Sequence, residues 1–223
     1  PHHLSRLILL TPAGFHNKPP AFAKPFLWFT PLWAWLIRRY LRNGTGMYVP
    51  TSMLRAVMTK LMADMQEMPA LGELMRLVIR TCMSGDISQW DRALQLPHYN
   101  PRAMPAVSAH TVLHLMQLID SGRFQLYDHG SAAANRAVYD AARPPDIAAN
   151  YHRLRPLPVD LMAGRQDGVI SPENVHRHLH ALRAAGVQVS LREFASGHLD
   201  FTFSPKDDLR VYILSRLLLP CSP

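Results

Sequence analysis

The sequence predicts an α/β fold in which a helical block separates a first strand from a later run of alternating strands and helices. Residues 4–11 form a short apolar run that Pro12 and Gly14 follow, which is typical of a buried strand. Residues 157–219 read as strand, helix, strand and helix. Such an alternation predicts a parallel sheet whose strands are joined by right-handed helical crossovers.

Two strands are predicted in the C-terminal region. Residues 157–163 are almost continuously apolar and end at Gly164, which is typical of a strand. Residues 187–194 instead alternate apolar and polar side chains, which indicates another strand.

Helix signals stand between and after these strands. Ser171 has the residue type of an N-cap, and Pro172 suits the first helical position, so a helix is predicted to begin there. Gly186 is predicted to end that helix, because glycine readily adopts the left-handed conformation found after a helix C-terminus. Residues 205–219 are predicted to form a closing helix.

The block from about residue 18 to residue 121 reads mostly as helices, because apolar residues recur there at steps of three and four. Prolines separate these stretches. We expect a partial core of residues 1–17 and 106–223, and a helical cap of residues 18–105 inserted at the edge of the sheet. The predicted apolar faces are Leu54, Val57, Met58, Leu61, Met62 and Met65; Leu71, Leu74, Met75, Val78 and Ile79; and Val112, Leu115, Met116 and Ile119.

Methionine is concentrated in the cap, where eight of the eleven methionines lie between Met47 and Met83. Methionine is flexible and fills irregular gaps, so one interpretation is a loosely packed helical core. The other is an adaptable apolar surface that meets a variable apolar partner.

The formal net charge of +8 comes mainly from 20 arginines, against 4 lysines. The arginines are spread along the chain, and only Arg38, Arg39 and Arg42 form a tight group. This distribution does not favour a nucleic-acid interface, which needs clustered cations. A basic surface that faces anionic lipid fits the composition at least as well.

Several classes of protein are excluded by composition. Cys82 and Cys221 are the only cysteines, so there is no disulfide framework, and neither belongs to a metal-binding pattern. The longest apolar stretch, residues 26–37, has 12 residues and contains Pro31. A spanning helix needs about 20 residues, so we expect no transmembrane segment.

Two titratable residues directly follow the two C-terminal strands. Asp167 stands in Gly-Arg-Gln-Asp-Gly after the first, and His198 stands in Ser-Gly-His after the second. Functional groups of open parallel sheets gather at the carboxyl ends of the strands. If these strands are neighbours, the carboxylate can orient the imidazole, and the imidazole can then accept a proton from a nucleophile. The order of acid and then histidine is that of the α/β-hydrolase fold. The alternative is two ordinary surface turns.

Other candidate groups are weaker. Asp200 lies two residues after His198 and ranks second to Asp167 as the partner of the imidazole. His176, His178 and His180 share one predicted helix, but a metal site would need a further ligand facing them. A solvated helix face is the preferred interpretation of these three histidines, and we expect no metal.

Five segments of the chain are specific in combination and in order: Leu7 to Phe15, the helix of Ser108 to Ser121, Phe124 to Asn135, Ala163 to Asp167 and Gly197 to Phe201. Together they resemble the acid lipase family of α/β-hydrolases, which includes lysosomal and gastric types. The resemblance covers roughly residues 4–15 and 105–215 and implies the C-terminal part of the hydrolase sheet. It further implies a serine ester hydrolase of neutral lipids, triacylglycerol or steryl ester, that needs no cofactor. Asp167 would be the triad acid and His198 the general base, and the family's usual location is lysosomal or secreted.

The sequence departs from that family in one respect, because it contains no Gly-x-Ser-x-Gly nucleophile motif. Ser84 and Ser131 adjoin glycines but lack the pattern. In the family this motif lies upstream of the position that matches Leu4. We therefore expect the chain as written to be inactive, either as part of an enzyme or as a non-catalytic lipid-binding or scaffolding protein.

The aromatic stretch of residues 26–37 contains Trp28, Trp33 and Trp35. These rings are expected to be either cap core or a segment that touches a lipid surface, where aromatic side chains are favoured and nearby arginines can meet anionic headgroups. In the second case they would bind substrate. The expected partners are therefore a lipid ester and a lipid surface, with the oligomeric state left open.

Overall fold

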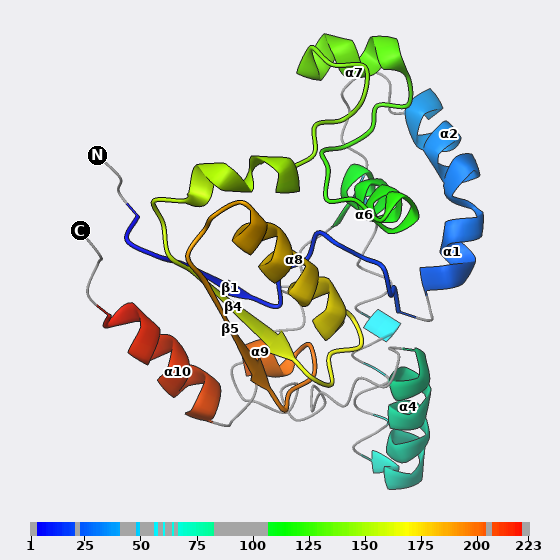
Figure 1. Ribbon diagram of the computed structural model, residues 1–223. Coiled ribbons are helices and arrows are strands. Elements are labelled where there is room, and N and C mark those ends of the chain that lie inside the picture. The colour runs from blue at the N-terminus through cyan, green and yellow to red at the C-terminus, as the bar shows by residue number, and fades with distance from the viewer. Residues whose placement is uncertain are drawn as a thin grey trace.

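The computed structural model describes residues 4–20, 23–40, 48–49, 56–57, 60, 64, 67–82, 107–203 and 207–219. Its centre is a parallel sheet in the order β1-β4-β5 (Figure 1). The strands are β1 (Leu7–Leu10), β4 (Val159–Gly164) and β5 (Val189–Phe194). All three strands predicted from the sequence are present. β4 and β5 are neighbours, so the loops that follow them lie at the same end of the sheet.

The middle strand β4 is buried along its whole length. Its register aligns Leu7 with Val159 on one side and Val159 with Val189 on the other. A strand paired on both edges and covered on both faces must be apolar at nearly every position, which explains its continuous apolar sequence. By contrast, the side chains of β1 and of most of β5 are only partly buried.

Helices cover both faces of the sheet. Successive side chains of β4 point in opposite directions, so the strand packs against helices on both sides. Val159, Leu161 and Ala163 pack against α8 (Pro172–Ala184) and the 3-10 helix η3 (Ala148–Leu154). Met162 points the other way and packs with Leu209 of α10 (Asp207–Leu217). The core therefore has three layers, with α8 and α10 on opposite faces (Figure 1).

One charged residue is buried in the α10 face of the sheet. Asp160 of β4 is 1% exposed, and it accepts hydrogen bonds from Arg6 at 2.7 Å and from Arg216 at 2.6 and 3.0 Å. Ser190 of β5 donates to the same carboxylate. The carboxylate thus ties the segment before β1, the strand β5 and the last helix to the middle strand.

The predicted boundaries of α8 are confirmed. Ser171 is its N-cap and Pro172 its first residue, although the Ser171 side chain makes no capping hydrogen bond. The helix ends at Ala184, and Gly186 then adopts a φ of +76°, the left-handed conformation that favours glycine. The closing helix predicted at residues 205–219 is α10.

The helical block contains α1 (Lys24–Trp28), α2 (Thr30–Tyr40), α4 (Pro69–Cys82) and α6 (Ala109–Ser121). The predicted face of α6 was only partly right. Met116 is buried as predicted, but Leu115 is 42% exposed and Leu113 is fully buried instead. The reason is that α6 packs through Leu113 and Ala109 against Ala34 of α2. The helix predicted at residues 54–65 falls mostly outside the described residues.

Some apolar side chains of the helical block are exposed rather than buried in a core. Met68 is exposed, as are Leu74 and Leu77 of α4. The other methionine side chains between Met47 and Met83 are outside the described part. The division into core and cap stays a prediction.

Five described elements were not predicted. They are the short antiparallel pair β2 (Tyr48–Val49) and β3 (Val107–Ser108), the helices α7 (Ala132–Tyr139) and α9 (Asp200–Phe203), and η3. Among the helices that the structure describes, none combines the length and apolar character needed to cross a membrane.

Candidate functional site

The loops after β4 and β5 bring an acid and a histidine together at one end of the sheet. His198 Nδ1 lies 2.9 Å from Asp167 Oδ2. The two residues come from loops that follow neighbouring parallel strands, and the carboxyl ends of such strands open at the same edge. The predicted contact is therefore present.

Backbone hydrogen bonds continue the pairing of β4 and β5 into these loops. Arg165 N donates to Phe194 O at 2.9 Å, and Gln166 N donates to Ser196 O at 3.2 Å. The loops approach so closely at Gly164 that a Cβ there would lie 2.4 Å from Ser196 O. Only glycine fits this position without displacing backbone, so Gly164 ends the strand and also brings the two loops together.

Three donors surround the Asp167 carboxylate, whose side chain is fully buried. Val169 N and Ile170 N both donate to Oδ1, at 2.9 and 2.7 Å. Oδ2 faces His198. The plane of the carboxylate is fixed independently of the imidazole, because two backbone amides hold one of its oxygens.

The contact defines which nitrogen of His198 carries the proton. An ionised carboxylate only accepts hydrogen bonds, so Nδ1 of the neutral imidazole is the protonated nitrogen and Nε2 carries the lone pair. The side chain of His198 is 31% exposed, which leaves it accessible from the sheet edge. An imidazole held in this way can act as a general base, and the carboxylate can stabilise the imidazolium that forms.

Asp200 takes a different place. Its Oδ2 accepts a hydrogen bond from Gly197 N at 2.7 Å, so its carboxylate holds the backbone of the histidine loop. The ranking of Asp167 before Asp200 as the partner of the imidazole is consistent with these contacts. The backbone role of Asp200 was not predicted from the sequence.

A cavity of about 470 Å³ lies beside the acid loop. Its wall includes the charged side chains of Lys18, Arg165 and Glu173, and Lys18 and Glu173 form an ion pair. Pro19, Gln166, Asp167, Gly168, Ser171 and Pro172 complete the lining.

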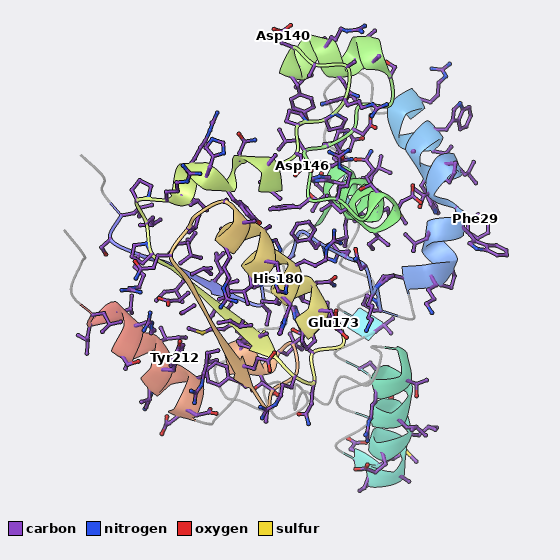
Figure 2. All side chains as sticks on the ribbon, viewed as in Figure 1. Phe29, Asp140, Asp146, Glu173, His180 and Tyr212 are labelled. Atoms are coloured by element: carbon purple, nitrogen blue, oxygen red, sulfur yellow. The ribbon has the colours of Figure 1, made fainter. Side chains whose placement is uncertain are left out.

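The three tryptophans are not among the residues that line this cavity. Trp28, Trp33 and Trp35 lie on α1 and α2 and are 89%, 45% and 58% exposed. The neighbouring Phe29 also points outward from this part of the molecule (Figure 2). The structure thus places these rings on the surface, apart from the cavity beside Asp167.

The three histidines of α8 do not share one environment. His180 is exposed and labelled on α8 in Figure 2, and His176 Nε2 lies 2.7 Å from Glu193 Oε1. His178 is only 3% exposed, so the expectation of a solvated face was wrong for it. No group of three or more metal-ligating side chains occurs within the part of the chain that the structure describes.

His178 is buried because it shares the apolar face of α8 with Val175, Leu179 and Leu182. Its Nδ1 lies 2.6 Å from Tyr151 Oη, which links α8 to η3. Burial lowers the pKa of His178 to about 4, so the ring is neutral at pH 7. Its spacing from Val175, Leu179 and Leu182 could have indicated this position, but its polar residue type suggested an exposed one.

Comparison with curated proteins finds partial similarity to lipases. The chain is 29% identical to lipase member N from Homo sapiens over 116 residues, which cover 51% of this chain and 27% of that protein. It is 30% identical to lipase member N from Mus musculus over 124 residues, covering 53% and 28%. Similarity to gastric triacylglycerol lipase from Homo sapiens is 29% over 107 residues, covering 47% and 25%.

These matches span about a quarter of the length of the curated relatives. No family model matches the chain. The small parallel sheet with helices is compatible with a partial α/β fold. Similarity at this level, over about half of the chain, supports an acid-lipase-like family.

Proposed function

We propose that this chain supplies the acid and the general base of a lipase-like serine ester hydrolase that acts on neutral lipid esters, triacylglycerol or steryl ester. The observation that carries this proposal is the 2.9 Å contact between His198 Nδ1 and Asp167 Oδ2 at the carboxyl ends of neighbouring strands. The names of the relatives, which are lipases, support the choice of substrate class.

In this mechanism His198 Nε2 takes the proton of a serine hydroxyl as the serine oxygen attacks the ester carbonyl. The resulting imidazolium is stabilised by Asp167 and returns the proton to the departing alcohol. Water then attacks the acyl-serine in the same way and releases the fatty acid. The sequence contains no Gly-x-Ser-x-Gly motif, so the proposed serine is outside residues 1–223, and these residues alone are expected to hydrolyse no ester.

The test is a fusion that supplies the nucleophile. The preceding portion of lipase member N, joined in frame to residues 1–223, is expected to hydrolyse p-nitrophenyl butyrate and emulsified triolein. His198→Ala is expected to lower kcat by a factor on the order of 10³ or more, because a triad without its base loses most of its rate.

His180→Ala is the matched control. His180 is exposed on α8, so this substitution is expected to leave kcat unchanged. Equal activity of the His198→Ala fusion and the unmodified fusion would remove His198 from the mechanism. A folded fusion that hydrolyses neither ester would reject the hydrolase assignment itself.

A non-catalytic lipid-binding function is the second candidate, and the exposed aromatic surface favours it. On α1, α2 and the residue between them, five apolar side chains are more than 40% exposed: Trp28, Phe29, Leu32, Trp33 and Trp35. Exposed apolar groups gathered on one short segment mark an interaction site more often than scattered ones do. We infer that this segment docks on a lipid surface in either candidate function.

Removing the ring of Trp28 is expected to weaken docking. Binding of the 223-residue chain to phosphatidylcholine vesicles, followed by tryptophan fluorescence and by sedimentation, should fall roughly tenfold in Trp28→Ala, since burying such a side chain contributes about 1.5 kcal/mol or more. Leu214→Ala serves as the control because Leu214 is equally apolar and 50% exposed, but lies on α10. Identical vesicle affinity for both variants would contradict docking through α1 and α2.

A further inference from the structure

The loop that carries His198 is held by contacts on both sides of the histidine. On the N-terminal side, Ser196 O accepts from Gln166 N at 3.2 Å and Gly197 N donates to Asp200 Oδ2 at 2.7 Å. On the C-terminal side, Phe201 packs edge-on against Phe194, with ring centroids 6.3 Å apart. The backbone of His198 thus lies between two fixed points.

The contact of Asp200 with Gly197 closes the turn that leads into α9. Asp200 is the first residue of this helix, and its carboxylate reaches back to the backbone N–H three residues earlier in the chain. The helix itself has four residues. A helix this short gains little from its own hydrogen bonds, so the side-chain contact across residues 197–200 supplies much of the order of this turn.

The orientation of His198 depends on this turn. His198 and Leu199 are the two residues enclosed between the donor Gly197 and the acceptor Asp200, so the 2.7 Å contact limits the backbone angles that direct the imidazole. Asp167 is already fixed by Val169 N and Ile170 N. The imidazole must therefore be brought to the carboxylate, because the carboxylate cannot follow the imidazole.

We propose that Asp200 is a positioning residue, whose carboxylate holds the Gly197 amide and thereby keeps the His198 imidazole on Asp167. Asp200 acts through the backbone and touches no reacting atom. Its consequence for catalysis rests on the proposed function, whereas its consequence for the position of His198 does not.

Two substitutions of Asp200 distinguish the effect of its hydrogen bond from the effect of its negative charge. Asp200→Ala removes the acceptor for Gly197 N. Asp200→Asn keeps an acceptor oxygen of nearly the same shape. Loss in the alanine variant with rescue in the asparagine variant is expected if the hydrogen bond matters, whereas a role of the negative charge would make both variants fail.

The first measurement is NMR of the histidine rings in the ¹⁵N-histidine-labelled 223-residue chain. A proton held between Nδ1 and a carboxylate gives a low-field signal that Asp167→Ala should remove. We expect Asp200→Ala to broaden or lose the His198 signal and Asp200→Asn to retain it. The ring signals of His178, which contacts Tyr151 elsewhere in the core, should stay unchanged in every variant.

Two outcomes would overturn the positioning role. One is an unchanged His198 signal in Asp200→Ala. The other is loss of the His198 and His178 signals together, because that result would make Asp200 a residue of general folding.

The second measurement uses the fusion described above. Asp200→Ala should lower kcat by roughly 100-fold with KM unchanged, since a misplacement of about 1 Å costs that much, and Asp200→Asn should stay within about threefold. Full activity of Asp200→Ala would overturn the proposal. Absence of hydrolysis from all fusions, with the NMR pattern as expected, would defeat the hydrolase assignment and leave the positioning role of Asp200 supported.

Discussion

Replacement of Asp160 by alanine is expected to destabilise the fold by about 3–5 kcal/mol, the cost of breaking a buried ion pair by removing one partner. The carboxylate is the shared partner of Arg6 and Arg216, whose side chains are 11% and 25% exposed. Without it, two cationic groups remain against the sheet with little access to water. The free energy of unfolding in urea at pH 7 measures the loss.

The same site predicts how this loss depends on pH. Burial alone raises the pKa of Asp160, but the hydrogen bonds from Arg216, Ser190 and Arg6 outweigh it and hold the pKa below its ordinary value of 3.8. The unfolded chain therefore takes up a proton at this carboxyl at a higher pH than the folded chain does. The stabilisation is complete above the ordinary pKa and is lost as the pH falls through the lower, folded value.

Asp160→Asn isolates this charge effect. The gap in unfolding free energy between the unmodified chain and Asp160→Asn should be large at pH 7 and should shrink as the pH falls below 3.8. The control is Asp207→Asn, which removes an exposed ion pair with Arg210 and should change stability by less than about 1 kcal/mol. A gap that stays constant with pH would show that shape, rather than charge, is what Asp160 contributes.

Local sequence patterns predicted the sheet because each strand has its own signature. The mostly apolar run of residues 157–163 predicted a strand, and Gly164 marked its end. Once β4 and β5 were predicted as successive parallel strands, the positions of Asp167 and His198 directly after them predicted their contact. Chain order and strand direction were sufficient for this part of the site.

Contacts between distant residues could not be predicted in this way. Asp160 interrupts an apolar run, and its partners lie 154 and 56 residues away, at Arg6 and Arg216. No local pattern reports that two arginines and a serine converge on one carboxylate. The fold has to form before the charge has a partner, so its role emerges only from the three-dimensional arrangement.

The missed helix α7 has a different explanation. Ser131 caps it by accepting a hydrogen bond from Ala134 N at 3.1 Å, and this signal is readable in the sequence. The helix has eight residues, too few for an apolar repeat to show. Its one buried residue is Asn135, whose Oδ1 accepts from His129 N and whose Nδ2 donates to Asp128 Oδ1, so a polar side chain occupies the place where a pattern search expects an apolar one.

Asp167→Asn is expected to lower kcat of the nucleophile-bearing fusion by roughly 10⁴-fold while leaving the fold intact, as when a triad acid is replaced by its amide. The surrounding donors determine how the new side chain sits. Val169 N and Ile170 N both donate to Oδ1, so the amide oxygen takes that position and its NH₂ group faces His198 Nδ1.

That orientation reverses the tautomer of the imidazole. An NH₂ group donates a hydrogen bond, so Nδ1 of His198 becomes the acceptor and the ring proton moves to Nε2. A protonated Nε2 cannot take the proton of a serine hydroxyl, and the general base is lost although no atom has been removed from the ring. ¹⁵N chemical shifts of the two ring nitrogens should exchange their assignments between the unmodified chain and Asp167→Asn.

The matched control for this substitution is Asp140→Asn. Asp140 is exposed at the end of α7 with a φ of 56°, a conformation that asparagine also tolerates, so neither kcat nor the His198 signals should change. Activity of Asp167→Asn within tenfold of the unmodified fusion would show that His198 works without this carboxylate. In that case the 2.9 Å contact at the sheet edge would be structural, and the proposed division of roles between the two loops would fail with it.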